Sequence, residues 1–215
     1  MTTEQARSFD ERGFFVLDGV LTGDDLARTR KEVDGFEAGT EAFLRDLCAD
    51  LVGPDVRLYW DQAVYKKPEK PRRFPWHQDN GYAYVEPQQY LTVWLALVDA
   101  TEDNGCPQVV PGQHRHGTLA HHYVDPLGYE CISGDPPDAV AAPARAGGAV
   151  VFSSLTPHLT GPNLTTDVRK AWILQYAPEG ARVLEGDPAA GPPTGSHPCT
   201  DPDRQPPVLR GGRPA

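Results

Sequence analysis

Short apolar segments, each bounded by glycine or proline, fill the middle of this chain and limit what it can fold into. The segments are VRLYWDQAVYK (56–66), YLTVWLALVDA (90–100), CPQVV (106–110), GGAVVFSS (147–154) and KAWILQYAP (170–178). They are rich in β-branched and aromatic residues, which favour strands. Residues 90–100 are almost continuously apolar, as expected of a strand that is buried on both faces. Many short strands with Gly/Pro turns predict a β-sandwich or a closed barrel.

The region before residue 55 has a different pattern and is expected to be largely helical. GFFVLDGVL (13–21) is a short apolar stretch and predicts a strand. Thr22 follows as the predicted N-cap of a helix. The apolar face of that helix is predicted to contain Leu26, Val33 and Phe36. A second helix is predicted near 41–52, because its leucines recur at helical spacing.

The last part of the chain is dense in proline, glycine and aspartate. GDPAAGPPTGSHPCTDPDRQPP (186–207) is not expected to form regular structure. The sequence therefore predicts a single domain over residues 1–215. It would have a helical N-terminal part at 1–54, a β core at 55–180, and a tail or covering loop at 181–215.

Composition excludes several classes of partner. The formal net charge is -10, with 30 acidic and 20 basic residues, which argues against nucleic acid as a partner. No apolar run approaches the roughly 20 residues of a membrane span. The N-terminal MTTEQARSFDERG has no apolar signal-peptide region, so a cytoplasmic location is expected. The four cysteines show no CxxC spacing and are expected to be reduced. The sequence does not indicate an oligomeric state.

A histidine and an aspartate stand two residues apart in FPWHQDNGY (74–82). On a strand, residues i and i+2 point to the same face. His77 and Asp79 would then converge on one side, with Gln78 pointing away. A neutral imidazole beside a carboxylate provides two ligands of a divalent-metal site. A lone HxD arises often by chance, so a third ligand is needed to make the prediction specific.

Seven histidines offer candidates for that third ligand. His158 is the best of them, because it lies just beyond an apolar strand whose end could place it at a barrel mouth. Two histidines and one carboxylate form the facial triad of non-haem iron(II) oxygenases. The alternatives are the HxH pair His114 and His116, which could also bind metal, and the pair His121 and His122, which could be a solvated loop.

Arg169 gives the triad a specific context. It follows His158 by eleven residues, and the intervening GPNLTTD is a turn by composition, so the two residues are expected on adjacent strands. An arginine that points into an apolar barrel needs an anionic partner. The planar guanidinium suits a carboxylate. A dicarboxylate such as 2-oxoglutarate could chelate the metal at one end and contact Arg169 at the other. The alternative is a surface strand residue in an ion pair.

These motifs together resemble the phytanoyl-CoA dioxygenase family of iron(II)- and 2-oxoglutarate-dependent oxygenases. The segments that carry the resemblance are GFFVLDGVLTGDDLARTRKEV (13–33), VYKKP (64–68) with WHQD (76–79), VWLALVDATEDNGCPQVVPGQH (93–114), PHLTGPNLTTDVRKAW (157–172) and DPDRQPPVLRGGRP (201–214). The resemblance covers nearly the whole chain, in the order of the family. It implies a mainly β fold, the double-stranded β-helix or cupin-like jelly roll, with N-terminal helices packed outside one sheet.

The resemblance also implies roles for individual residues. The residues implied as iron ligands are His77, Asp79 and His158. The residues implied around 2-oxoglutarate are Arg169 and Thr160 at its distal carboxylate, Trp94 beside it, and Gln62 near it or the substrate. Trp94 could equally be core packing. The chain departs from the family at Gln113, usually Ser or Thr, and at Ala149, often Asp.

The activity implied is hydroxylation of an unactivated C–H bond in a small molecule, with iron(II) as cofactor and 2-oxoglutarate and dioxygen as cosubstrates. Succinate and CO₂ would be released. The substrate is expected to be a specialised metabolite or an amino-acid-like molecule. Desaturation, epoxidation or ring closure at the same site, a non-redox cupin-type isomerase or lyase, and a barrel that only binds remain as alternatives.

The segment KKPEKPRR (66–73) is basic in a chain that is acidic overall. It could attract an anionic group of the substrate to the active-site mouth. It could equally be a solvated loop.

Overall fold

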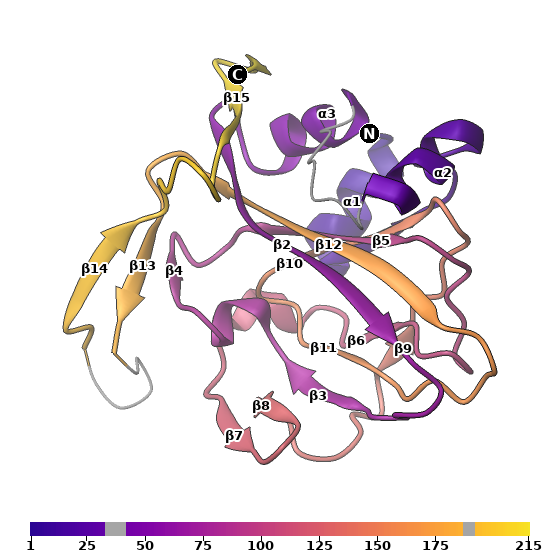
Figure 1. Cartoon of the computed structure of the whole chain (residues 1–215). Coiled ribbons are helices and arrows are strands. Elements are labelled where there is room, and N and C mark those ends of the chain that lie inside the picture. Colours follow the sequence, from indigo (N-terminus) through magenta and orange to yellow (C-terminus); the bar gives the residue numbers. More distant parts are fainter. Residues whose placement is uncertain (33–41, 187–191) are drawn as a thin grey trace.

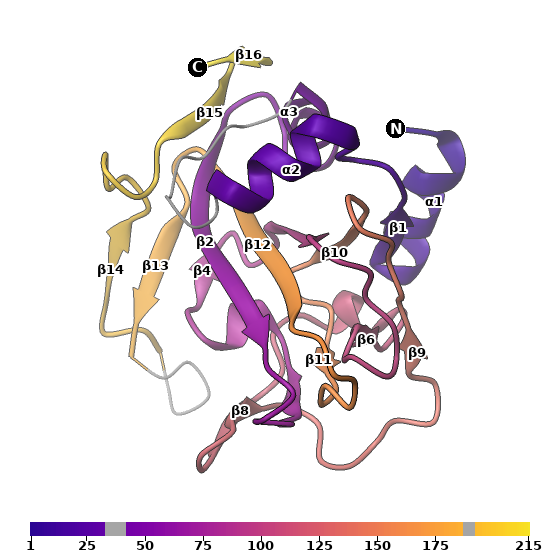
Figure 2. The same ribbon diagram turned by 45° about the vertical axis from the view of Figure 1, so that its right-hand side comes forward.

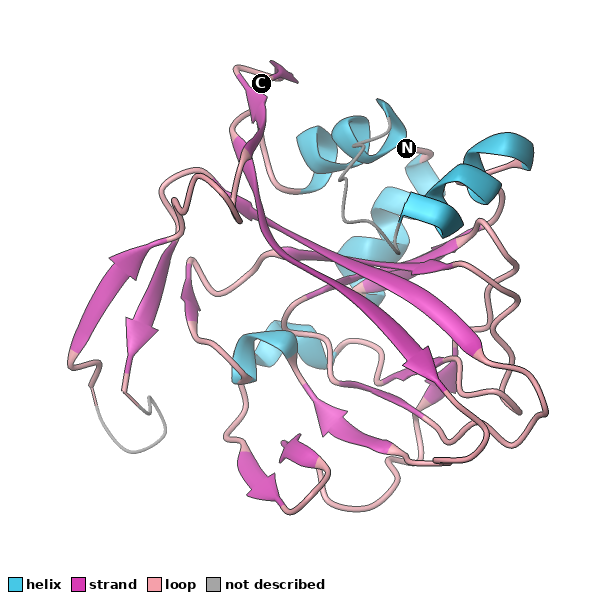
Figure 3. Ribbon diagram, viewed as in Figure 1, coloured by secondary structure: helices cyan, strands magenta, loops and turns pink. Residues whose placement is uncertain are grey.

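The computed structural model describes residues 1–32, 42–186 and 192–215, and it is built mainly of antiparallel strands. A large and a small sheet face each other, and the helices lie outside the large one (Figures 1, 2 and 3). The large sheet contains β1 (Phe14–Leu17), β10 (Ala149–Ser153), β5 (Leu91–Ala96), β12 (Arg169–Pro178), β2 (Val56–Lys66), β15 (Pro207–Arg210) and β16 (Arg213–Pro214), in that order. The small sheet contains β3 (Phe74–His77), β11 (His158–Thr160), β6 (Pro107–Val109) and β9 (Val140–Ala141), in that order. This arrangement confirms the predicted mainly β class.

The helices are α1 (Thr3–Arg12), α2 (Gly23–Glu32) and α3 (Ala42–Leu51). α1 begins at a capping box, in which Gln5 N donates to Thr2 Oγ1 at 3.2 Å and Thr2 N donates to Gln5 Oε1 at 2.7 Å. It ends at Gly13, which adopts the left-handed conformation that favours glycine. α1 and α3 bury apolar side chains against the large sheet, including Phe9 and Leu44. Val33 and Phe36, predicted for the apolar face of the helix that follows Thr22, lie outside the described residues.

β5 is buried along its whole length, as its apolar sequence predicts. Val93 and Leu95 join the core under the helices, whereas Trp94 and Ala96 face the space between the sheets. Strand alternation therefore divides this segment between two cores. Both faces are therefore largely apolar, with Thr92 as the polar residue of the inner face.

The same alternation along β12 places a charged side chain between the two sheets. Trp172 and Leu174 pack under the helices, and Ala171 and Ile173 face the other way. Arg169 has the parity of Ala171, so its side chain is directed between the sheets. It is 1% exposed.

β2 pairs with β12 and contains a β-bulge. Trp60 lies opposite Gln175 and Leu58 lies opposite Tyr176, so Tyr59 is the extra residue. A bulge places two consecutive side chains where a regular strand would place one. Tyr59 and Trp60 therefore both line the cavity between the sheets.

The small sheet brings two distant segments together. His77 at the end of β3 is the cross-strand partner of His158 at the start of β11. The expectation that His158 and Arg169 lie on adjacent strands is wrong, because β11 belongs to the small sheet and β12 to the large one. The turn between them crosses from one sheet to the other, so the two side chains approach the same cavity from opposite walls.

The prediction that the end of the chain lacks regular structure is also wrong. β15 adds to the edge of β2, and β13 (Arg182–Glu185) and β14 (Gly195–Pro198) form a three-stranded sheet with β4 (Val85–Glu86). Prolines occur at strand ends and edges, where a missing N–H is tolerated. β7 (His122–Val124) and β8 (Gly128–Glu130) form a separate hairpin. No helix in the described residues is long and apolar enough to cross a membrane.

Gly147 joins the N-terminal segment to the large sheet and generates a stability prediction. It has a φ of 84°, its carbonyl accepts from Leu21 N at 2.7 Å, and a Cβ on it would overlap the Leu21 carbonyl oxygen. Gly147→Ala should lower the free energy of unfolding by at least about 3 kcal/mol, because strain and a backbone clash add.

Gly134, with a φ of 81° and no atom near its Cβ position, is the matched control. Gly134→Ala should cost about 1–2 kcal/mol in urea unfolding. Equal effects of the two substitutions would contradict the contact.

Candidate active site

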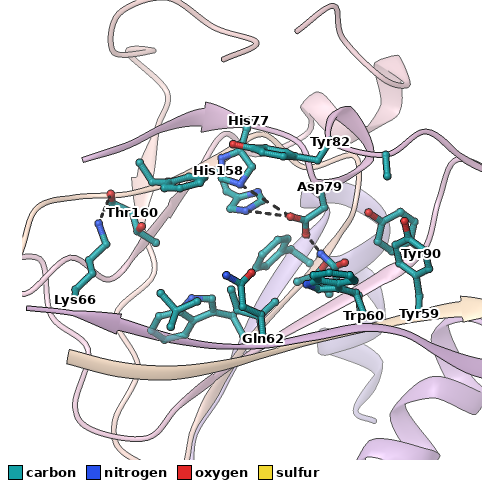
Figure 4. Close-up of a pocket in the computed structure, with 18 of the residues that line it drawn as sticks. Tyr59, Trp60, Gln62, Lys66, His77, Asp79, Tyr82, Tyr90, His158 and Thr160 are labelled. Carbon is teal, nitrogen blue, oxygen red and sulfur yellow. Dashed lines mark hydrogen bonds and ion pairs between the residues drawn. The ribbon is translucent and has the colours of Figure 1, made fainter. Parts of the chain in front are cut away.

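Three potential metal ligands meet at one wall of the cavity. His158 Nε2 lies 3.7 Å and His77 Nε2 lies 4.0 Å from Asp79 Oδ1. One ligand atom of each residue lies within 4.8 Å of the others, a spacing that could hold a metal ion. Figure 4 shows the three side chains converging on one point. The sequence prediction that His158 joins the HxD pair is therefore matched by the geometry.

Both histidines are held in the tautomer that a metal requires. His77 Nδ1 donates to the carbonyl of Pro75 at 2.8 Å, and His158 Nδ1 donates to that of Thr156 at 3.0 Å. In this tautomer Nε2 carries the free lone pair and points at the site. Burial, and then the neighbouring His158, hold the pKa of His77 well below its usual range. A neutral imidazole is the form that binds a metal.

Asp79 is not on a strand, contrary to expectation. β3 ends at His77, and Asp79 begins a 3₁₀ turn, η1 (Asp79–Gly81). Gln78 between them is still extended, with φ -106° and ψ 142°, so alternation continues far enough to bring the side chains of His77 and Asp79 to one side. Gln78 points away, as predicted, and its amide donates to the carbonyl of Leu155 at 2.6 Å.

Thr92 fixes the orientation of the Asp79 carboxylate. Its hydroxyl donates to Asp79 Oδ2 at 2.6 Å. Oδ2 is therefore engaged, while Oδ1 faces the two imidazoles. Sequence reasoning missed Thr92, although its even parity with Trp94 on the fully buried β5 would have placed it on the inner face.

The alternative histidines do not form a second site. Within the described ranges, the three-residue group suited to a metal is the one that contains His158. His121 uses both ring nitrogens: Nδ1 donates to Leu119 O at 2.8 Å, and Nε2 accepts from Gln78 N at 3.0 Å. His122 lies 3.4 Å from Glu130 on the β7–β8 hairpin. His114 is buried against Gly13.

Arg169 lies across the cavity from the triad with its charge unmatched. None of its three guanidinium nitrogens has a hydrogen-bond partner among the described residues. The guanidinium carbon lies 5.0 Å from the centroid of the Trp94 ring, which leaves its N–H donors free. Burial lowers the pKa of Arg169 to about 10. A buried cation without an anion is costly, so the site fits a carboxylate ligand.

The other residues predicted around 2-oxoglutarate line the same cavity. Its volume is about 390 Å³, within the range of small-ligand pockets. Thr160, Trp94 and Gln62 all form part of its wall together with Arg169. Thr160 lies at the Lys66 end in Figure 4, and Gln62 lies on the wall opposite the triad.

Lys66 is the residue of the basic segment 66–73 that enters the cavity wall. Its Nζ donates to the carbonyls of Arg72, Thr160 and Gly161 at 2.9, 2.9 and 2.5 Å. Burial, and then the charge of Arg169, lower the pKa of Lys66 to about 7. Strand parity along β2 would have found it, because Trp60, Gln62, Val64 and Lys66 alternate inward.

The remaining basic side chains of the segment do not line the cavity. Arg73 forms an ion pair with Asp135 at 2.8 Å. The cavity lining therefore gives no support to an anion-attracting mouth built from this segment.

The chain matches known proteins over most of its length. A model of the phytanoyl-CoA dioxygenase (PhyH) family matches residues 41–171. Methylphosphonate hydroxylase from Gimesia maris is 30% identical over 186 residues, which are 83% of this chain and 67% of that protein. The peroxisomal phytanoyl-CoA dioxygenase of Mus musculus is 24% identical over 239 residues, covering 86% of this chain and 71% of that protein.

A solved structure shares the fold over most of both chains. EvdO2 from Micromonospora carbonacea var. aurantiaca, complexed with 2-oxoglutarate, aligns with a TM-score of 0.73 and 25% identity. The alignment covers 87% of this chain and 94% of EvdO2. Fold and site together define the class of cupin-like, non-haem iron, 2-oxoglutarate-dependent oxygenases.

The chain belongs to the phytanoyl-CoA dioxygenase family. It is an oxygenase whose cofactor is iron(II) and whose cosubstrates are 2-oxoglutarate and dioxygen. This confirms the family resemblance read from the sequence.

The Thr92–Asp79 hydrogen bond generates a prediction for metal binding. Thr92→Val keeps the side-chain volume but removes the donor to Asp79 Oδ2. The affinity for Fe(II) or Mn(II) should fall roughly 10- to 100-fold, as for other groups that orient metal ligands. Thr92→Ser retains a hydroxyl and should stay near the wild-type affinity. Metal titration of folded protein, checked by circular dichroism, gives both values. Unchanged affinity in Thr92→Val would show that the hydroxyl does not orient the ligand.

Proposed function

We propose that this enzyme hydroxylates a C–H bond of a small molecule, with His77, Asp79 and His158 as the iron ligands. The observation that carries the proposal is the unpaired guanidinium of Arg169 in the same cavity as the triad. A non-redox isomerase or lyase would not need a buried cation opposite its metal. A dicarboxylate cosubstrate does need one, because its far carboxylate must be matched in a dry site.

The donor set fits the cofactor and the cosubstrate. Two imidazoles and one carboxylate are the ligands of non-haem iron(II) oxygenases, and they leave positions open for other ligands. Thr160 belongs to the cavity wall at the Lys66 end, so its hydroxyl can donate to the carboxylate held by Arg169. Trp94 lies against the guanidinium and restrains it. Gln62 lines the cavity without a hydrogen-bond partner among the described residues and is assigned to the cosubstrate or the substrate.

When bound, iron(II) with 2-oxoglutarate and dioxygen supplies the oxidising power that converts C–H to C–OH, while 2-oxoglutarate leaves as succinate and CO₂. The protein supplies positioning and a shielded environment. The backbone carbonyls of Pro75 and Thr156 hold the proton of each neutral imidazole at Nδ1, so that Nε2 faces the triad. Thr92 holds the carboxylate, Arg169 sets the direction of the cosubstrate, and the buried aromatic walls exclude water.

Hydroxylation is preferred to halogenation because the carboxylate of Asp79 would occupy a coordination position that a halide would otherwise need. Desaturation, epoxidation and ring closure would use the same residues. They differ from hydroxylation only in where the substrate radical lies relative to its neighbours.

The direct test is substrate-dependent succinate release. Purified enzyme with Fe(II) and 2-oxoglutarate is screened against pools of small molecules, and turnover without substrate is the baseline. A stimulating pool should yield succinate and a product heavier by one oxygen in equal amounts. Product formation without 2-oxoglutarate consumption would contradict the proposal.

Arg169 provides the sharpest mutational prediction. Arg169→Ala should weaken 2-oxoglutarate binding by about 2–5 kcal/mol, or roughly 30-fold to several-thousand-fold, because a buried charge pair is broken. Binding of Fe(II) should change little. Arg169→Lys keeps a charge but loses the planar fork, so it should fall between wild type and Arg169→Ala. Isothermal titration with 2-oxoglutarate measures all three. Unchanged affinity in Arg169→Ala would remove the main support for this cosubstrate site.

The lowered pKa of Lys66 predicts a pH dependence. Its pKa of about 7 means that the free protein loses this proton as pH rises through neutrality. An anion held by the adjacent Arg169 favours the protonated amine, so 2-oxoglutarate affinity should be highest below pH 7 and should decline above it. Lys66→Met should flatten this dependence between pH 6 and pH 8. A wild-type affinity that does not change across this range would contradict the assignment.

A further inference from the structure

The charged side chains that line the cavity are all engaged, Lys66 by backbone carbonyls and the others by the iron and 2-oxoglutarate assignments. The charged and titratable members of the wall, the tyrosines apart, are Lys66, His77, Asp79, His158 and Arg169. Under the proposed function, the positive charges of iron(II) and Arg169 balance the negative charges of Asp79 and the 2-oxoglutarate dianion. Lys66 has three N–H donors, and three backbone carbonyls accept them. The donors of both cationic side chains in the wall are therefore engaged, and neither is left to hydrogen-bond a charged substrate group.

The rest of the wall is aromatic, aliphatic or neutral and polar. Besides Trp94 and Phe152, the aromatic members of the wall are Tyr59, Trp60, Phe74, Tyr82 and Tyr90. Tyr59 and Trp60 both face inward because of the bulge in β2. Such a wall binds rings through stacking and edge contacts.

Two of the aromatic rings lie at the outer part of the cavity, on opposite walls. Trp60 belongs to β2, whereas Tyr82 follows η1 on the side of the triad (Figure 4). They are 42% and 44% exposed and both line the cavity, so part of each ring is accessible to a ligand. The guanidinium carbon of Arg204 lies 4.8 Å from the centroid of the Trp60 ring. The ring centroids of Tyr82 and Tyr129 lie 5.2 Å apart in an edge-to-face contact. These contacts restrain both rings.

Neutral hydrogen-bonding groups are also free in this wall. The hydroxyls of Tyr59 and Tyr90 and the amides of Gln62 and Gln175 have no hydrogen-bond partner in the part of the chain that the structure describes. Burial raises the pKa of Tyr59 to about 12, so its hydroxyl keeps its proton and can donate. These groups match hydroxyl and carbonyl groups of a ligand and offer nothing to a full charge.

We propose that the part of the substrate that enters this cavity is an uncharged ring bearing hydroxyl or carbonyl groups, held between Trp60 and Tyr82. The proposal rests on the proposed function, because it assumes that the triad and Arg169 are occupied by iron and 2-oxoglutarate. A carboxylate, phosphonate or ammonium group inside the cavity would remain unpaired, at a high cost. An amino acid is therefore excluded as the entering group. The volume of about 390 Å³ admits a ring or two beside 2-oxoglutarate, and larger portions must extend outside.

The test uses matched neutral and anionic ring probes. Protein loaded with Ni(II), which does not support turnover, and saturated with 2-oxoglutarate is dialysed against each probe. One pair is 4-methylumbelliferyl glucoside and the corresponding glucuronide. The other is 2-(hydroxymethyl)anthraquinone and anthraquinone-2-carboxylate. At least one neutral probe should bind, and at least 10-fold more tightly than its anionic match.

Variants locate the binding. Trp60→Ala should weaken the neutral probe about 10-fold, in line with the value of a stacked ring. Gln62→Lys adds the missing cation and should move the preference toward the anionic probe. Tyr123→Ala is the control, because Tyr123 is a 60% exposed tyrosine that does not line the cavity.

The outcomes separate this inference from the proposed function. Equal binding of a pair, preference for the anion, or no binding of either neutral ring overturns the inference, provided that 2-oxoglutarate binds in the same samples. Failure of 2-oxoglutarate to bind would instead overturn the proposed function. Loss of probe binding in Tyr123→Ala, or none in Trp60→Ala, would show that the ring binds elsewhere.

Discussion

The guanidinium of Arg169 is the constraint on which the rest of the site depends. It is buried between two sheets, 1% exposed, with no hydrogen-bond partner among the described residues. Trp94 supplies an aromatic face to it, and no carboxylate in the described part of the chain hydrogen-bonds to it. Such an arrangement is costly in the free protein and becomes favourable when a dianion enters. A His/Asp/His triad alone would fit several metal enzymes, whereas a triad facing an unmatched cation selects a dicarboxylate cosubstrate.

Much of the fold could be predicted because alternation leaves a clear pattern in buried strands. Within the segment 90–100, β5 is buried on both faces as expected, whereas Asp99 beyond its end is exposed, and β12 follows the predicted segment 170–178 closely. The C-terminal strands could not be predicted. β15 forms by adding to an edge of β2 that is distant in sequence, and this tertiary pairing outweighs the low strand propensity of a Pro/Gly-rich segment.

Part of the site could be predicted from residue type and spacing in the sequence. These two features select His77, Asp79, His158 and Arg169, and the structure brings all four to one cavity. The prediction that His158 and Arg169 lie on adjacent strands was wrong. Whether a turn stays within one sheet or crosses to the other depends on the packing between the sheets. Thr92 has an ordinary residue type, so only the three-dimensional contact with Asp79 reveals its role.

Visible absorption under anaerobic conditions tests the central claim most directly. Chelation of iron(II) by the 2-oxo acid group gives a charge-transfer band that neither component shows alone. Adding 2-oxoglutarate to the Fe(II) protein should produce this band, and His158→Ala should abolish it, because the proposed iron site would lose one of its three protein ligands. Absence of the band in wild-type protein that binds both components, or full retention in His158→Ala, would contradict this account of the site.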